Sequence, residues 1–519
     1  MCNTAINLKN MENQTQMLIV MIAYMAFIIL LGFYQGRKVK TGSDFAIAGR
    51  KLPGWIAALS ERATGESSWA LLGLPGAAYA TGLLEIWTAI GCVAGILFAW
   101  IILAWRLRDE AEKYEVDTFT DYIAKSHGEV GKWIRVVGSS TIVFFFFFYV
   151  GAQFIGGGKT LENLFGIEKI YGMLLVVGLV IPYTIYGGFR SVTYTDVVQA
   201  IIMIITLIAA PIAGVIYLSN LPEGTVFATS IGEALSKAGD SYSTFTGGAV
   251  LQEGSELELT LNNLFPNVKN IVSGLGTGIV IAGAFSWFFG YLGGQPQLTT
   301  RFMAITNAKE AKKARNIGVI WTIIAYTGAL MIGWIGIAIY GPSGLLDRET
   351  VMPEVLTTLF HPAIAGLLIT GVLAAIISTA NSLLILSSTE LSENIIKPLR
   401  GKEMDTKSSL RLSRIVTGLL SLIALILAYY SPTDLIYTIV GYVWAGIGST
   451  FSVVILLTLF WKRYHGIAAI LTIVSGLLFT IIWISTGMDK ILTSRLLTFI
   501  VALVVAVLST YLIKKRIVN

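Results

Sequence analysis

The sequence predicts an all-α integral membrane protein, and three observations support this fold class. Only 13% of the 519 residues are charged and 55% are apolar, whereas a soluble chain usually carries about 25% charged residues. Apolar runs of about 20 residues, the length that crosses a bilayer as a helix, recur along the chain. The basic residues gather in alternate loops. We therefore expect one multi-pass transmembrane domain over 1–519, in contact with membrane lipid.

Thirteen apolar segments are long enough to be membrane-spanning helices. The first of them is about 20 residues long and basic residues follow it, which predicts a retained span rather than a cleaved secretory signal. The expected spans are 17–36, 55–82, 84–105, 136–157, 171–190, 195–218, 272–296, 316–341, 363–390, 413–430, 435–461, 467–486 and 493–513.

An N-terminus outside and a C-terminus inside the cell best explain the charge distribution. In this orientation 28 of the 37 Lys and Arg residues lie in cytoplasmic segments and eight in outside segments, while Arg62 lies within a span. An even number of spans would remove this bias. The same rule accounts for the net charge of +6, so we expect a protein of the cell (inner) membrane and no nucleic-acid partner.

Cysteine and histidine residues form no pattern typical of an enzyme. Cys2 lies in the N-terminal tail and Cys92 in an apolar span, so neither a disulfide framework nor a metal cluster is expected. His127, His361 and His465 fall in or beside loops and lack the HExxH spacing of a zinc enzyme.

The longest outside loop, 219–271, is rich in Ser, Thr and Gly. Its composition predicts a solvated surface loop, and its length leaves room for a short helix or a gate. A soluble catalytic domain does not fit in it.

The second expected span carries three charges in its sequence WIAALSERATGESSWALLGLPGAAYATG. A charged side chain at the bilayer centre costs about 2.5–3.5 kcal/mol on insertion scales, so Glu61, Arg62 and Glu66 must face protein or water. Arg62 and Glu66 are four residues apart and can pair on a continuous helix, which would join neighbouring helices. Alternatively, the helix unwinds near Thr64–Ser67 and frees carbonyl oxygens for a small cation.

The seventh expected span ends SWFFGYLGGQPQLTTRFMAI, with glycines and a proline that interrupt helical hydrogen bonding. Its aromatic residues suit an interface belt, a packed core or the wall of a ligand site. Because this span lies five after the second, the two interrupted helices occupy corresponding positions in two five-helix halves. Such a pair indicates the central site of a secondary transporter.

Two further spans carry polar groups. The ninth, GLLITGVLAAIISTANSLLILSS, places Ser378, Thr379, Asn381 and Ser382 in one apolar helix. Their hydroxyl groups can bond back to the preceding turn, or they can ligate a hard cation. The fifth ends IYGGFRSVTYTDVVQ, where Asp196 suits a helix cap or a role in gating or coupling.

Four stretches, ALSERATGESSWALLGLPGAAYATG, YGGFRSVTYTDVVQA, FGYLGGQPQLTTRFMAI and LAAIISTANSLL, together resemble the solute:sodium symporter family, most closely its sodium/proline branch. The likeness runs in order over about 30–430. It implies a leucine-transporter-like fold with inverted repeats at 55–218 and 272–461 and two additional helices at 467–513. It also implies alternating access, with Na⁺ as the coupling ion and no organic cofactor.

The resemblance also implies two sets of site residues. The sodium site maps onto main-chain oxygens and two side-chain oxygens: Ala63, Glu66, Ala375, Ser378 and Thr379. The solute pocket maps onto Ser67, Ser68, Tyr149, Trp287 and Tyr291.

The chain departs from the proline branch inside this site. Gly65-Glu66-Ser67-Ser68 stands where that branch has Asp-Met-Ser-Gly, so the carboxylate is moved by one residue and lengthened. Arg62 stands where small residues are usual, and GYLGGQP is one residue longer than the branch's GYFGQP. Arg62 and Asp196 are therefore the candidates for coupling or gating.

From these residues we expect a transporter, not an enzyme: a sodium-coupled symporter that imports a small organic solute, proline or another amino acid. One alternative is a proton-coupled or uncoupled porter in which Glu66 titrates. Another is a transporter-like membrane sensor, which would usually carry an added soluble signalling domain, whereas this chain ends six residues after the last expected span.

Overall fold

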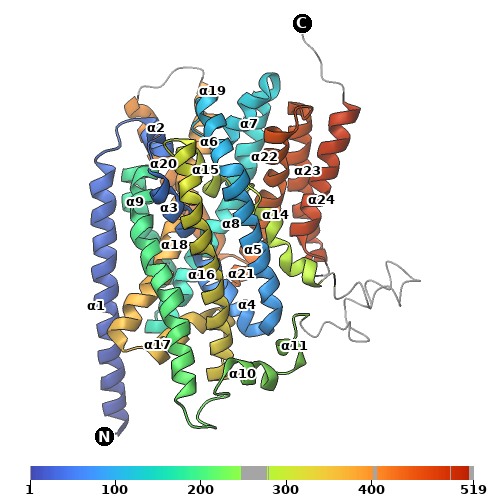
Figure 1. Ribbon diagram of the computed structural model, residues 1–519. Helices are drawn as coiled ribbons and strands as arrows, with labels where there is room; N and C mark the ends of the chain where they lie inside the picture. The colour runs from blue at the N-terminus through green and yellow to red at the C-terminus, as the bar shows by residue number, and fades with distance from the viewer. Residues whose placement is uncertain (1, 247–277, 279, 401–405, 491, 514–519) are drawn as a thin grey trace, which may run out of the picture.

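The computed structural model describes residues 2–246, 278, 280–400, 406–490 and 492–513, and these form a bundle of helices (Figure 1). Up to residue 219 the helices are α1 (Cys2–Gly36), α2 (Gly42–Ile47), α3 (Gly54–Ser68), α4 (Leu74–Thr81), α5 (Ile86–Phe98), α6 (Ala104–Lys113), α7 (Phe119–Ser126), α8 (Gly131–Phe165) and α9 (Lys169–Ser219).

The later elements complete the bundle and cover one of its ends. They are α10 (Ile231–Ala238), α11 (Asp240–Ser243), α14 (Trp287–Tyr291), α15 (Pro296–Ala304), α16 (Ala308–Tyr340), α17 (Val351–Leu359), α18 (Pro362–Leu391), α19 (Lys397–Arg400), α20 (Thr406–Tyr429), α21 (Ile436–Val443), α22 (Thr450–Phe460), α23 (Gly466–Ser485) and α24 (Ser494–Leu512).

Ten helical stretches in the described residues are long and apolar enough to cross a membrane, compared with thirteen expected spans. One stretch, Gly54–Lys113, covers two expected spans, and between them the chain turns at Gly82, whose φ is 64°. In α9 a second turn lies at Gly188, with φ 53°, and the apolar helix Lys169–Pro182 in the first part of α9 is shorter than a full span. The seventh expected span, 272–296, lies partly outside the described residues.

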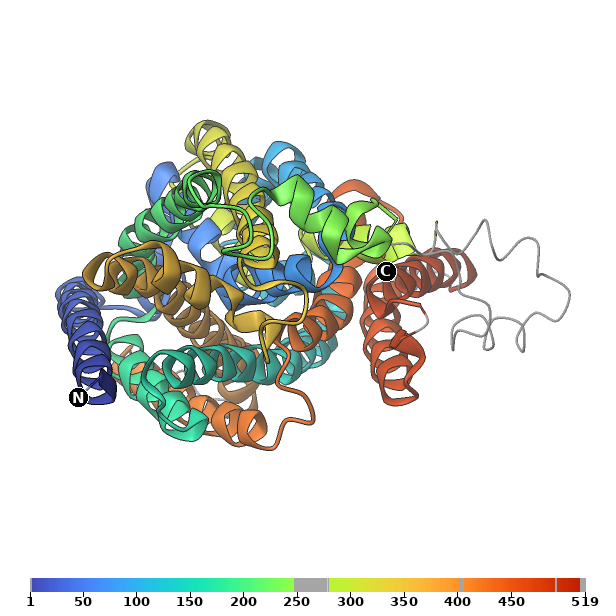
Figure 2. The ribbon, with the colours of Figure 1, turned by 90° about the horizontal axis from the view of Figure 1, so that it is seen from below.

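The start of α1 and the end of α24 lie at opposite ends of the bundle (Figure 1). This placement is what an odd number of crossings produces. Seen along the bundle, α1 lies at one edge and the pair α23–α24 at the opposite edge (Figure 2).

The most enclosed helix is α18, which packs against α1, α3, α8, α9 and α20. Of its most apolar window, 83% is buried, compared with 22% for α24 at the edge. A polar residue on α18 therefore faces protein rather than lipid. The expected ninth span, 363–390, falls within this helix.

Two helices are interrupted where the sequence predicts interruptions. In α3, Ser67 has φ 49° and ψ −168°, and a π-helical turn, η2 (Trp69–Gly73), follows. The other break lies between α14 and α15, where Gly293 has φ 103°. Next to it, a Cβ on Gly294 would meet the Gly448 carbonyl oxygen at 1.9 Å, so only glycine fits there.

The loop that begins at residue 219 contains the short helices α10 and α11, so the expectation of a short helix is confirmed. The main chain of Tyr242 in α11 packs on Gly82, where a Cβ would meet the Tyr242 carbonyl oxygen at 2.2 Å. Residues 247–271 of this loop lie outside the described part of the chain.

Candidate functional site

Two polar groups lie on different faces of α3, just before its break at Ser67. The first group, which we call the hydroxyl face, consists of Ser60 and Thr64, four residues apart. Their hydroxyl groups point to Asp196 of α9. Ser60 Oγ donates to Asp196 Oδ2 over 2.6 Å, and Ser378 Oγ of α18 donates to Asp196 Oδ1, also over 2.6 Å. One buried carboxylate therefore joins α3, α9 and α18.

Arg301 of α15 balances the charge of this carboxylate. Its Nη2 lies 3.0 Å from Asp196 Oδ2 and donates to Ser382 Oγ over 2.6 Å, and its Nε donates to Ser60 Oγ over 2.7 Å. Both ions are buried, so the pair depends on these hydrogen bonds for compensation. Asp196 lies inside α9, where it does not act as a helix cap.

Two of the five residues predicted to bind sodium, Ser378 and Thr379, reach α3 from α18. Thr379 Oγ1 donates to the Thr64 carbonyl oxygen over 2.9 Å, next to Ala63, and Ala375 lies one turn before Thr379. Thr64 Oγ1 lies 3.3 Å from Ser378 Oγ. The Ser378 and Thr379 hydroxyls thus contact other helices instead of bonding back to their own turn.

The second polar group, the charged face of α3, consists of Glu61, Arg62 and Glu66. Arg62 Nε donates to Glu61 Oε2 over 2.5 Å and its Nη2 to Glu61 Oε1, while its Nη1 donates to Glu66 Oε1 over 3.0 Å. All three side chains are at most 2% exposed. The predicted pairing of Arg62 with Glu66 is confirmed, and so is the break in the same helix.

The charged face also ties α3 to other helices. Arg62 Nη1 donates to Thr322 Oγ1 of α16 over 3.0 Å, and Trp100 Nε1 donates to Glu61 Oε2 over 3.1 Å. A Cβ on Gly65 would lie 3.3 Å from Arg62 Nη2. The guanidinium therefore fills the space beside position 65, where the proline branch has its carboxylate.

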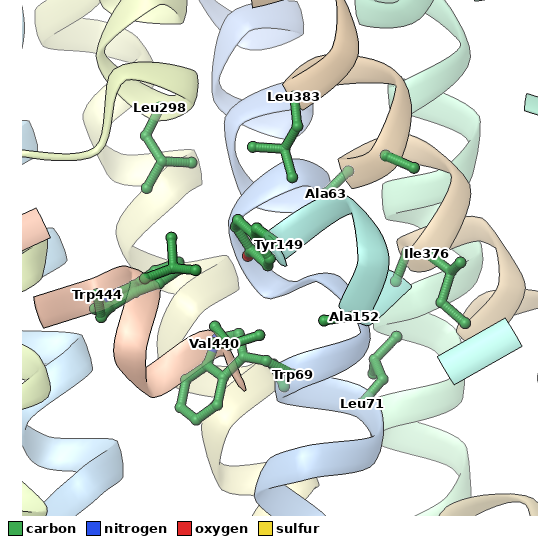
Figure 3. Close-up of a cluster of buried hydrophobic side chains, with 14 of the residues drawn as sticks. Ala63, Trp69, Leu71, Tyr149, Ala152, Leu298, Ile376, Leu383, Val440 and Trp444 are labelled. Atoms are coloured by element: carbon green, nitrogen blue, oxygen red, sulfur yellow. The ribbon is translucent and has the colours of Figure 1, made fainter. Parts of the chain in front are cut away.

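Four of the five residues predicted for the solute pocket contact one another or a shared ring. Tyr149 Oη donates to Ser67 Oγ over 3.1 Å, and the rings of Tyr149, Tyr291 and Trp287 lie 5.4, 5.2 and 5.7 Å from that of Trp444. We call Trp69, Tyr149, Trp287, Tyr291 and Trp444 the aromatic cluster. Figure 3 shows three of these side chains close together: Tyr149 of α8, Trp69 directly after α3 and Trp444 directly after α21.

The fifth predicted residue, Ser68, has its backbone N–H bound to Gln153 Oε1 over 3.0 Å. Its buried Oγ makes no hydrogen bond among the described residues. A buried hydroxyl without a partner at the edge of the aromatic cluster is available to a ligand.

Sequence reasoning missed Trp69, Trp444 and Tyr326. The ring of Trp69 stacks on Trp287 at 4.1 Å and 13°, and Tyr326 Oη lies 3.0 Å from Tyr291 Oη. Trp69 belongs to the GESSW stretch that predicted the break, so its position beside Ser68 could have identified it. Nothing in the sequence around Trp444 or Tyr326 sets them apart from other aromatic residues of apolar spans.

A separate ion group lies at the end of the bundle where α1 starts. Lys159 Nζ lies 2.8 Å from both Asp347 Oδ2 and Glu349 Oε2. Glu349 also accepts from the backbone N–H groups of Ile436 and Tyr437 over 3.0 and 2.9 Å. This carboxylate holds the segment before α17 against the first turn of α21.

The site offers hydroxyl, carbonyl and carboxylate oxygens rather than the ligands of a transition metal. No group of three His, Cys, Asp or Glu residues suited to a metal ion occurs among the residues that the structure describes. Oxygen ligands suit hard cations.

The chain is similar to known proteins over most of its length. Residues 45–476 match the sodium:solute symporter family. The high-affinity proline transporter PutP of Bacillus subtilis (strain 168) is 34% identical over 468 residues, 90% of this chain and 91% of the relative. The sodium/proline symporter of Staphylococcus aureus (strain JH9) is 32% identical over 514 residues, 96% and 92% of the two chains.

Solved structures show the same fold at lower identity. A Na⁺-coupled sialic acid symporter, solved in a substrate-bound outward-open state, superposes with a TM-score of 0.73 at 18% identity, covering 96% of this chain and 98% of that one. A nucleobase-cation-symport-1 family transporter with bromovinylhydantoin bound gives a TM-score of 0.51 at 12% identity, covering 91% and 93%. The protein is thus a multi-pass membrane transporter and not an enzyme, and the chain belongs to the sodium:solute symporter family.

Proposed function

We propose that this chain imports a small organic solute, proline or another amino acid, by sodium-coupled alternating access. The observation that carries the proposal is the meeting of Ser378 and Thr379 with α3 directly before its break at Ser67. The relatives that bear the names of proline transporters support the choice of solute class.

The sodium site would use oxygens of α3 and α18, two helices that pack against each other. The Ser378 hydroxyl donates its hydrogen bond to Asp196, so its oxygen can offer a lone pair to a cation. Thr379 reaches the same turn of α3, and the carbonyl oxygens of Ala63, Glu66 and Ala375 would complete the shell. Irregular backbone at this depth is stable only where it lines a site.

The aromatic cluster would hold the solute. Its rings can pack on the apolar part of a small amino acid, and Ser67 and Ser68 place a hydroxyl and the ends of helical segments beside it. The stacked rings of Trp69 and Trp287 would have to separate for the solute to reach this place from outside. The Ser67 break lies next to both proposed sites.

Coupling follows from this shared break. A cation that binds between α3 and α18 favours the conformation in which α3 presents Ser67 and Ser68 to the solute. By linkage, the solute then favours cation binding by the same factor. The outer ion group around Glu349 would separate and re-form as the outer side opens and closes.

We further propose thirteen spans in a leucine-transporter-like arrangement, with repeats at 55–218 and 272–461 and two additional helices at 467–513. The turns at Gly82 and Gly188 support this number, because each lies within two residues of the end of an expected span. The charge distribution supports an outside N-terminus in the cell (inner) membrane.

The test is uptake by proteoliposomes that contain the purified chain. An inward sodium gradient at equal pH on both sides should drive accumulation of at least one amino acid, and a potassium gradient of the same size should not. A panel of amino acids, carboxylates and sugars identifies the solute. Accumulation that follows a pH gradient and is indifferent to sodium would instead favour the proton-coupled porter with Glu66 as the titrating group.

A further inference from the structure

We infer that Glu66 determines specificity by binding a protonated amine of the solute. The inference rests on the proposed function, because it names the chemistry that the same site would select. It concerns the charged face of α3, which the proposed sodium site does not use except through the Glu66 main chain.

The charged face holds more negative than positive charge. Glu61, Arg62 and Glu66 are buried together with two carboxylates and one guanidinium. On the hydroxyl face, by contrast, Asp196 has Arg301 as its partner. The charged face therefore keeps one negative charge in excess, which is costly to bury without a further positive group.

The hydrogen bonds within the charged face are unevenly distributed between Glu61 and Glu66. Glu61 takes both the Nε and Nη2 groups of Arg62 and also the indole N–H of Trp100. From the same guanidinium Glu66 receives one hydrogen bond, from the Nη1 group to Oε1. The excess charge is thus concentrated on Glu66.

One carboxylate oxygen of Glu66 has no hydrogen-bond donor among the described residues. Its Oε2 is buried and makes no hydrogen bond within the described part of the chain, while the Tyr326 hydroxyl interacts with the same carboxylate. The Tyr326 hydroxyl lies 3.0 Å from that of Tyr291, and Tyr149 donates to Ser67, the residue after Glu66, so this carboxylate borders the aromatic cluster. A buried carboxylate oxygen without a donor, next to the proposed solute site, is placed to accept from a ligand.

A protonated amine is the ligand group that fits these surroundings. It donates a charge-assisted hydrogen bond to the carboxylate, and aromatic faces attract cations. It also supplies the positive charge that the buried group lacks. A carboxylic acid or a sugar without an amine supplies neither.

Removal of the Glu66 charge should not disrupt the fold. In Glu66→Gln the pair of Glu61 and Arg62 remains and is electrically neutral, and the Gln carbonyl can still accept from Arg62 Nη1. Glu66→Met introduces the residue of the proline branch and is a second variant without the charge. Glu390→Gln is the matched control, because Glu390 is a buried carboxylate that Ser139 and Asn394 hold on α18, twelve residues from Ser378.

The experiment measures solute-evoked currents on solid-supported membranes at saturating sodium, with ²²Na⁺ binding to the same preparations. Solutes are used as matched pairs with and without the amine: L-proline and cyclopentanecarboxylate, L-leucine and 4-methylpentanoate, L-alanine and propionate. In the unmodified chain we expect sodium-dependent currents from an amine and none from its partner. Glu66→Gln and Glu66→Met should raise the half-saturating amine concentration roughly ten- to a hundredfold, the effect of losing one charge-assisted hydrogen bond.

The sodium dissociation constants of both Glu66 variants should stay within about twofold of that of the unmodified chain. Glu390→Gln should change neither the sodium dissociation constant nor the half-saturating amine concentration by more than about twofold. Equal currents from an amine and its partner, or an unchanged amine concentration in both Glu66 variants, would overturn the inference and leave the proposed function standing. If no solute of any class evokes a sodium-dependent current and ²²Na⁺ does not bind, the proposed function falls, and the inference with it.

Discussion

The two faces of α3 differ in how they treat buried charge, although they lie on one helix within seven residues. On the hydroxyl face, Asp196 and Arg301 form a neutral pair with hydroxyl donors from α3 and α18. On the charged face, two carboxylates share one guanidinium. A balanced, fully bonded group suits a fixed frame for a cation site, whereas an unbalanced group suits the binding of a further charge.

The largest effect should come from Asp196→Asn. This change leaves Arg301 buried without its counter-ion, and breaking a buried pair costs about 3–5 kcal/mol. We expect a lower thermal midpoint in detergent and a loss of sodium-driven uptake of roughly two orders of magnitude or more. In the double variant with Arg301→Gln the midpoint should recover while uptake stays low. Recovery of both the thermal midpoint and the uptake would show that Asp196 and Arg301 only stabilise the fold.

Next in size should be the loss of a hydroxyl from the proposed sodium site. Ser378→Ala and Thr379→Ala should each raise the sodium concentration for half-maximal uptake about tenfold, which corresponds to about 1.4 kcal/mol. Ser378→Ala should have the larger effect, because it also leaves Asp196 Oδ1 without its donor. Thr379→Ser keeps the hydroxyl and should behave like the unmodified chain. Unchanged sodium dependence in both alanine variants would argue against the site.

A smaller effect on the solute should follow from Glu61→Gln. The change removes the excess charge of the charged face and leaves Glu66 alone with Arg62, so an amine should bind more weakly, by several-fold to about tenfold. Trp100 can still donate to the Gln carbonyl, and sodium binding should not change. A shift in sodium binding as large as that in solute binding would show that the two faces do not act separately.

The smallest effect should come from Gly65→Ala. The added Cβ would lie 3.3 Å from both Arg62 Nη2 and Leu298 Cδ2, so these side chains must move by a few tenths of an ångström. Alanine favours a helix over glycine by about 1 kcal/mol, which offsets the contact. We expect both half-saturation constants to stay within about threefold. A loss comparable to that of Asp196→Asn would mean that the charged face tolerates no displacement.

The sequence predicts the fold class and both helix breaks because their signals are local. Charges, glycines and a proline inside apolar segments identify Ser67 and the stretch before Pro296 as interruptions. The spacing of Arg62 and Glu66 likewise predicts their pairing.

The sequence cannot show how segments far apart in the chain meet. The role of Arg301 as the partner of Asp196 depends on the crossing of α9 and α15, 105 residues apart. Tyr326 joins the site because α16 packs against α3, and Trp444 because α21, which it follows directly, packs against η2 and α8. The thirteen expected spans also exceed the ten stretches that meet the length and composition criteria. The stretch Gly54–Lys113 covers two expected spans, the apolar helix Lys169–Pro182 is too short to count, and the expected span 272–296 lies partly outside the described residues.

The measurement that tests the central claim most directly compares Ser378→Ala with Glu66→Gln in the same proteoliposome preparation. Half-saturation constants for sodium and for an amine solute are measured in both variants, the latter at saturating sodium. Ser378→Ala should raise the sodium constant about tenfold and leave the solute constant within about twofold, and Glu66→Gln should show the reverse. If each variant shifts both constants to the same extent, the two faces of α3 do not divide the binding of cation and solute.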